Sequence, residues 1–250
     1  MSGIRSWGAY IPMMRLQLAA IAGGGRKAGA GAGERAVAYY DEDAVTMAVA
    51  AAAHCLDGID RRSVDGLLFA STSYDYKEKQ GAAVIAKALD LDRNAVTADF
   101  AASVRAGTTA LRAALDAVAA GSARNVLVVA SDCRPAPPRS PQEKSFGDGA
   151  AAFLVSRDDV RASIDAAHFV TDEIIDVWRT DRDPWVKSWE DRFVLEHGYQ
   201  RTTAEVCRGL FAKTGSTAAD FARAVLFGPD ARSQAGLAKA LGFDAKTRLQ

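Results

Sequence analysis

Residues 97–111, TADFAASVRAGTTAL, determine how the rest of the chain is organised. This stretch is typical of the end of a buried strand, a sharp turn and an alanine-rich helix that extends to about Gly121. In α/β proteins, ligands bind in the crevice beyond the carboxyl end of such a strand. The first backbone N–H groups of the helix favour a carbonyl oxygen or an anion there. The turn between strand and helix is therefore the candidate ligand site.

Strand and helix patterns alternate on both sides of this stretch. Strands are expected at residues 3–12, 64–70 and 125–131, and helices at residues 44–56 and 80–89. This alternation predicts an α/β fold, in which a parallel or mixed sheet carries helices on its faces. The acidic residues Asp41, Glu42 and Asp43 precede the first of these helices, and we expect them to cap it rather than to bind a metal.

The composition is that of a soluble globular protein. Of the 250 residues, 49% are hydrophobic and 25% are charged, and the net charge of zero gives no argument for nucleic-acid binding. Cys55, Cys133 and Cys207 are widely spaced, which predicts no metal site and indicates a reducing, cytoplasmic environment. No apolar run is long enough to predict a membrane span.

The carboxyl-terminal part of the chain repeats the amino-terminal part. Residues 64–92 contain LLFAS and then IAKALDLD, and residues 222–244 contain AVLFGPD and then LAKALGFD. Self-similarity at long spacing is typical of a duplicated fold, which we divide into residues 1–160 and 161–250. The second copy is expected to be partial, with an exposed sheet edge at residues 222–227 that promotes aggregation or needs a partner.

Five motifs follow one another along the chain. They are YDEDAVTMAV at 40–49, AGTTAL at 106–111, VASD at 129–132, FGDGAAA at 146–152 and DVWR at 176–179. Together they resemble the thiolase superfamily, and within it the hydroxymethylglutaryl-CoA synthase branch; the turn with Gly-Asp-Gly-Ala is also shared with ketoacyl synthase III. The resemblance implies a layered αβαβα fold with a complete first half and part of the duplicated second half. It also implies a dimer and chemistry on acyl-CoA thioesters.

The catalytic positions that the resemblance implies are occupied by other residues. The nucleophilic cysteine would stand at the start of the central helix, where this chain has Val104. Thr72 stands in place of the general-acid glutamate, and Gly228 in place of the histidine. Ser103 has a hydroxyl group but no local base, and we expect it to cap the helix. These departures argue against the usual acyl-cysteine condensation.

Candidate contacts for coenzyme A lie in three parts of the chain. Arg105 begins the central helix, where a thioester carbonyl would be held and where Ser103 or Thr72 would orient it. Arg26 and Lys27 belong to a glycine-dense stretch that is either a mobile surface loop or a phosphate contact. Trp178 and Arg179 belong to an aromatic, charged segment that lines a ligand tunnel or a subunit interface, or packs on its own domain.

Two main functions follow from these observations. The first is a hydroxymethylglutaryl-CoA synthase-like acyltransferase of a carbon–carbon bond-forming or bond-cleaving system, with an acyl-CoA bound at the start of the central helix. The second is a non-catalytic thiolase-fold subunit that supports an active thiolase-type partner, in a homodimer or a hetero-oligomer. A small-molecule binding protein that uses the vestigial pocket is a third. Whether the chain is an enzyme stays open on the sequence alone.

Overall fold

The computed structural model describes residues 2–21 and 33–244. The chain divides into two compact units, Met1–Ile164 and Asp165–Gln250. Each unit is described by itself below. None of the helices among the described residues is both long and apolar enough to cross a membrane.

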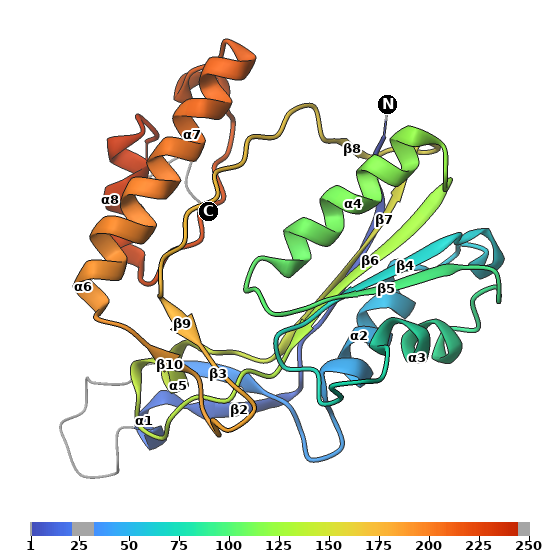
Figure 1. The fold of residues 1–250 in the computed structure, drawn as a ribbon, viewed down its shortest axis with the longest axis horizontal. Coiled ribbons are helices and arrows are strands. Elements are labelled where there is room, and N and C mark those ends of the chain that lie inside the picture. Colours follow the sequence, from blue (N-terminus) through green and yellow to red (C-terminus); the bar gives the residue numbers. More distant parts are fainter. Residues whose placement is uncertain (1, 22–32, 245–250) are drawn as a thin grey trace. The chain divides into compact units, whose positions relative to one another are not determined.

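A six-stranded mixed sheet is the centre of the first unit (Figure 1). Its strands, in spatial order, are β5 (Val96–Phe100), β4 (Gly66–Ala70), β6 (Asn125–Asp132), β7 (Gly149–Ser156), β1 (Gly3–Tyr10) and β8 (Ala162–Ser163). β4 runs parallel to both β5 and β6, whereas β7 is antiparallel to β6 and to β1. The carboxyl ends of β4, β5 and β6 therefore meet at one edge of the sheet.

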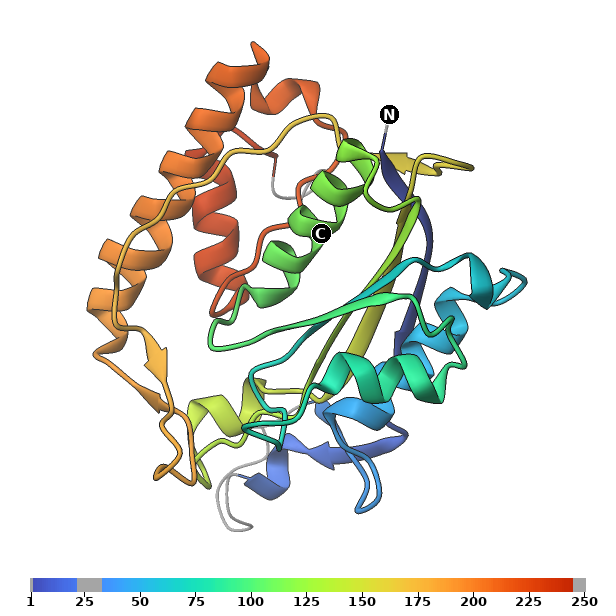
Figure 2. The same cartoon turned by 45° about the vertical axis from the view of Figure 1, so that its right-hand side comes forward.

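Helices cover both faces of this sheet (Figures 1 and 2). They are α2 (Ala44–Cys55) and α3 (Gly81–Ala88) on one face and α4 (Ala106–Ala120) on the other. In β6, Leu127 and Val129 pack with α2 and α3, while Val126 and Val128 pack with α4. Because successive side chains of a strand point to opposite faces, this apolar strand is buried on both sides. The α/β architecture expected from the alternating patterns is thus confirmed.

The ends of these helices follow the predicted signals. Asp43 caps α2, because its carboxylate accepts from the backbone N–H of Thr46 at 2.7 Å while the Thr46 hydroxyl accepts from the Asp43 N–H at 2.7 Å. Gly121 ends α4 in the left-handed conformation with φ of 78°. No group of three or more potential metal ligands occurs among the described residues.

Smaller elements flank the sheet in the first unit. They are β2 (Met14–Gln17), α1 (Leu18–Ile21), β3 (Glu34–Val37), the 3₁₀ helix η1 (Arg61–Ser63) and α5 (Pro141–Ser145). Next to β3, the Asp148 carboxylate accepts from the backbone N–H of Ala38 at 2.8 Å. Burial raises the pKa of Asp148. The turn before β7 is held against the end of β3 by this bond.

Helices with a small apolar core form the second unit. Its elements are β9 (Val177–Trp178), β10 (Lys187–Ser188), α6 (Asp191–Phe193), the π-helix η2 (Val194–Gln200), α7 (Arg201–Thr214), the 3₁₀ helix η3 (Ala218–Asp220) and α8 (Ala231–Ala240). The rings of Phe211, Phe221 and Phe243 pack with centroids 5.6 to 6.2 Å apart. They surround Ala238, which is fully buried.

The ends of α3 and α8 have the same local geometry. Leu91 and Phe243 each donate a backbone hydrogen bond to the carbonyl five residues earlier, at 3.0 and 2.9 Å. The residue before each of them is left-handed, with φ of 56° at Asp90 and 87° at Gly242. The repeated motif AKAL thus ends both helices in the same way.

The strand expected around residues 222–227 is not formed. Only Ala224 makes an isolated bridge, and the rest of the segment has no regular structure. Val225 and Phe227 are 80% and 88% exposed. A strand is stable only when it is paired, and within the described residues this segment has no neighbouring strand. The predicted sheet edge at this place is therefore wrong.

Candidate functional site

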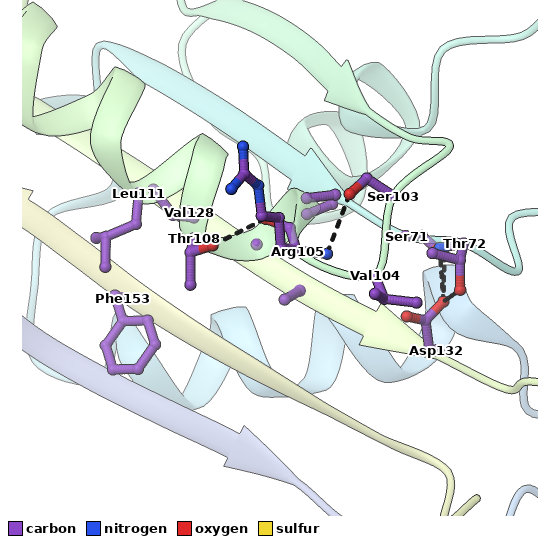
Figure 3. A pocket seen from close by; sticks show the side chains of 14 residues that line it. Ser71, Thr72, Ser103, Val104, Arg105, Thr108, Leu111, Val128, Asp132 and Phe153 are labelled. Carbon is purple, nitrogen blue, oxygen red and sulfur yellow. Dashed lines mark hydrogen bonds between the residues drawn. The ribbon is translucent and has the colours of Figure 1, made fainter. Parts of the chain in front are cut away.

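An open cavity of about 290 Å³ lies at the start of α4 in the first unit (Figure 3). Ser71, Thr72 and Asp132 form its polar end, at the carboxyl ends of β4 and β6. Leu111 of α4 and Phe153 of β7 form its apolar end. The cavity therefore offers an apolar surface beside a set of hydrogen-bonding groups.

The turn that leads into α4 has an unusual backbone. Ala102 is a non-glycine residue in the left-handed region, with φ of 61°. Two residues later, the Val104 side chain is 61% exposed where the turn borders the cavity. Such conformations cost free energy and cluster at ligand sites and active sites. The turn therefore combines backbone strain with an exposed apolar side chain.

Ser103 does not cap α4, so the prediction of a serine N-cap is wrong. The N-cap residue is Arg105, which makes no side-chain capping bond. Ser103 lies two residues before the N-cap, and its hydroxyl accepts from the Arg105 N–H at 3.3 Å. A guanidinium group has no acceptor atom, so the N-cap side chain makes no bond to the first N–H groups of α4. The first of these groups, the Ala106 N–H, donates instead to the Ser103 carbonyl at 3.0 Å. These groups carry the positive end of the helix dipole.

One oxygen of Asp132 organises the polar end of the cavity (Figure 3). Oδ1 accepts from the Ser71 hydroxyl at 3.1 Å and from the Ser73 hydroxyl at 2.8 Å. It also accepts from the backbone N–H and the hydroxyl of Thr72, at 2.7 and 3.0 Å. The hydroxyl proton of Thr72 therefore points at the Asp132 carboxylate. Asp132 was not among the predicted site residues, although the parallel pairing of β4 and β6 brings their ends together.

The three thiols of this chain all have raised pKa values. Burial raises the pKa of the Cys133 thiol to about 12, and the carboxylates of Asp148 and Asp132 act in the same direction. Burial also raises the pKa values of Cys55 and Cys207. None of the three lines the cavity. Because the thiolate is the nucleophilic form, these shifts lower the nucleophilicity of the three thiols at neutral pH.

The cavity brings together four of the predicted site residues: Ser103, Val104, Arg105 and Thr72. Trp178 of β9 and the following Arg179 belong to the second unit and are not among the cavity residues. Arg26 and Lys27 lie outside the described residues.

In the second unit, Tyr199 lies against Gly228, the position at which the resemblance implied an imidazole. A Cβ atom added to Gly228 would lie 2.8 Å from the Tyr199 hydroxyl oxygen. That oxygen is buried and has no hydrogen-bond partner among the described residues. Burial raises the pKa of Tyr199, and the charges of Asp230 and Cys207 add to the effect. The sequence contained no signal for this contact, because it depends on tertiary packing.

Comparison with known proteins identifies the family. Residues 98–173 match the family model of 3-oxoacyl-[acyl-carrier-protein] synthase III. The hydroxymethylglutaryl-CoA synthase of Aeropyrum pernix is 34% identical over 254 residues, and the match covers 97% of this chain and 69% of that protein. The chain belongs to the hydroxymethylglutaryl-CoA synthase family. The resemblance drawn from the five motifs is confirmed.

Solved structures show that this family member has the thiolase-like α/β fold. A hydroxymethylglutaryl-CoA synthase complexed with CoA superposes with a TM-score of 0.83 at 20% identity, over 98% of this chain and 64% of that one. The 3-oxoacyl-[acyl-carrier-protein] synthase III of Aquifex aeolicus gives 0.82 at 19% identity, over 100% of this chain and 84% of that one. The predicted fold class is confirmed.

Proposed function

We propose that this hydroxymethylglutaryl-CoA synthase homologue binds an acyl-CoA thioester at the start of α4, as an acyltransferase of a carbon–carbon bond-forming or bond-cleaving system. The observation that carries the proposal is the cavity at the uncapped start of α4. A solved synthase with the same fold is complexed with CoA, which supports the choice of ligand.

The start of α4 is suited to a thioester carbonyl. The Ala106 N–H donates to the Ser103 carbonyl, and the N–H groups that follow it in the first turn carry partial positive charge that favours a carbonyl oxygen. The apolar end of the cavity, with Leu111 and Phe153, accommodates the hydrocarbon part of an acyl group. Val104 presents methyl groups beside this position, so it packs against the ligand and forms no covalent bond to it. Within the turn before α4, Ser103 supplies the hydroxyl group that borders the cavity.

Two measurements with acyl-CoA test this proposal. Calorimetric titration is expected to show binding of acetyl-CoA or another short acyl-CoA. If the chain is catalytic, a burst of thiol release follows, and Ser103→Ala abolishes it. Ser122→Ala is the matched control, because its hydroxyl bonds to the Ala117 carbonyl at the other end of α4. Absence of acyl-CoA binding would contradict the proposal.

A non-catalytic role is the second candidate, and Val104 favours it. With valine at the helix start and thiol pKa values raised by burial at Cys55, Cys133 and Cys207, the protein would act by docking an active thiolase-type partner. Co-purification with the products of neighbouring genes tests this role. A homodimer that binds acyl-CoA and retains no other protein would argue for the first candidate.

A further inference from the structure

Phe153 is a large apolar side chain that the cores of the first unit do not use. It lies on β7, between β6 and β1 in the sheet. Along β7, Leu154 packs with α2 and α3, and Val155 packs with α4. Phe153 points to the α4 face as Val155 does, yet it is only half-buried and belongs to neither of these two clusters of described residues. Its ring lines the apolar end of the cavity instead, as Leu111 does (Figure 3).

The wall that leads to this end of the cavity is apolar. Val128 and Ala130 of β6 line it from the sheet, and Gly107 lines it from α4. A Cβ atom added to Gly107 would lie 3.3 Å from the Cβ atom of Ala130, so α4 and β6 approach each other closely here. The hydroxyl group of Thr108 donates to the Arg105 carbonyl at 2.9 Å. Because burying an unpaired polar group is unfavourable, this wall favours the hydrocarbon part of a ligand.

The distance from the start of α4 to Leu111 limits the length of such a group. Leu111 follows Ala106, the first residue of α4, by five positions. This spacing corresponds to a rise of about 7.5 Å along the helix axis. An extended chain advances about 1.2 Å per bond, because a residue with three backbone bonds spans about 3.3–3.6 Å. The path therefore holds about six bonds, the length of an acyl chain of about six carbon atoms.

We propose that the cavity selects acyl-CoA with an unbranched acyl chain of medium length, and that Phe153 sets the length limit. This inference rests on the proposed acyl-CoA function and assigns its substrate class. The close approach of α4 to β6 at Gly107 favours a chain without branches. Each CH₂ group buried in the cavity favours binding about fourfold, and carbons beyond the ring of Phe153 gain no further contact.

Calorimetric titration with free CoA, acetyl-CoA, hexanoyl-CoA and decanoyl-CoA tests the inference. In the unaltered protein, hexanoyl-CoA is expected to bind about tenfold or more tighter than acetyl-CoA, and decanoyl-CoA no tighter than hexanoyl-CoA. Phe153→Ala removes the ring and is expected to make decanoyl-CoA the tightest ligand. Phe153→Trp shortens the path and is expected to weaken hexanoyl-CoA binding about fivefold while acetyl-CoA binding stays unchanged. A general loss of folding cannot produce both results, because the two variants act in opposite directions.

Leu115→Ala is the matched control. Leu115 lies one helical turn after Leu111 on α4, is buried in the core and does not line the cavity. Its loss is expected to leave the order of affinities unchanged, and the affinity for free CoA is expected to stay the same in every variant.

The outcomes separate the inference from the proposed function. Equal affinities for acetyl-CoA and hexanoyl-CoA in the unaltered protein would overturn the inference alone. The same holds for an unchanged order of affinities in the two Phe153 variants, or for an equal change in Leu115→Ala. Failure of the unaltered protein to bind any acyl-CoA would overturn the proposed function and the inference with it.

Discussion

The Asp132 carboxylate shows how one side chain can hold a cavity wall in place. Its Oδ1 atom accepts four hydrogen bonds from the three residues that follow β4. Ser71 is only 4% exposed, so its hydroxyl cannot simply turn to water when this partner is lost. Hydrogen bonds to a charged group are stronger than neutral ones. We infer that Asp132 fixes the loop on which Thr72 lies.

Asp132→Ala is expected to reduce the free energy of unfolding by about 1–3 kcal/mol, because it leaves these donors unpaired. Chemical denaturation measures this change. Asp116→Ala is the matched control, since Asp116 forms an exposed ion pair with Arg112 on α4 and such pairs contribute about 0.5 kcal/mol. Equal effects of the two substitutions would contradict the role assigned to Asp132.

A cysteine introduced at position 104 would report the electrostatic effect of α4 on the pKa of a thiol. In Val104→Cys the new thiol would lie at the positive end of α4, which lowers the pKa of a thiol below its usual value. We expect iodoacetamide to modify it far faster than Cys133, whose pKa of about 12 leaves about one part in 10⁴ as thiolate at pH 8. Mass spectrometry across a pH series measures both rates. Ser122→Cys, beyond the carboxyl end of α4, is the control, and equal thiol pKa values at positions 104 and 122 would contradict the expectation.

At the scale of elements, the matching ends of α3 and α8 make a comparison within one chain possible. The left-handed residue is Asp90 after α3 and Gly242 after α8. A left-handed residue with a side chain costs about 1–2 kcal/mol, whereas glycine adopts this conformation without the steric cost. The end of α8 therefore indicates which residue suits the end of α3.

Asp90→Gly is expected to raise the free energy of unfolding by about 0.5–1 kcal/mol, after the larger entropy of glycine in the unfolded chain is subtracted. The denaturation midpoint measures the gain. Asp92→Gly is the control and is expected to destabilise, because the Asp92 carboxylate accepts from the Asn94 N–H at 2.8 Å. A loss of stability in Asp90→Gly would show that the Asp90 side chain has a role of its own.

Local sequence patterns predicted most helices and strands, because caps and chain reversals depend on residues that are neighbours in the sequence. Asp43 caps α2 and Gly121 ends α4, as their residue types indicate. The prediction of Ser103 as the cap of α4 is wrong because the helix begins at Ala106, after a turn with a left-handed residue at Ala102 that no sequence pattern reveals. Residues 222–227 have a strand pattern, but a pattern cannot supply a pairing strand.

The contacts described above also differ in how far the sequence could predict them. Ser103, Val104 and Arg105 are neighbours in sequence and could be singled out together. The contact of Asp132 with Thr72 joins residues 60 positions apart, and that of Tyr199 with Gly228 depends on the packing of two segments. Such contacts are set by tertiary structure, so the sequence named only one member of each pair.

At the scale of the whole molecule, the segment before α8 exposes two large apolar side chains, from which we predict an effect on self-association. Val225 and Phe227 are 80% and 88% exposed, and neighbouring exposed apolar residues promote contact between molecules. We expect the double variant Val225→Lys and Phe227→Lys to lower self-association, measured by sedimentation velocity at several concentrations. Phe169→Lys, at a 56% exposed residue, is the control. Unchanged association in the double variant would show that this segment is not the contact.

Because β4, β5 and β6 run in parallel, the segments that follow them lie at one edge of the sheet and the segments that precede them lie at the other. We expect these two sets of segments to differ in their tolerance to insertion. The segments that border the cavity follow β4, β5 and β6, whereas residues 57–65, 89–95 and 121–124 lead into the opposite ends of these strands. A peptide tag or a fluorescent label placed within residues 121–124 would lie at the end of α4 opposite to the cavity. Reporter groups for ligand binding in the cavity can therefore be attached there, whereas the same insertion after Ala102 would disrupt the turn that borders the cavity.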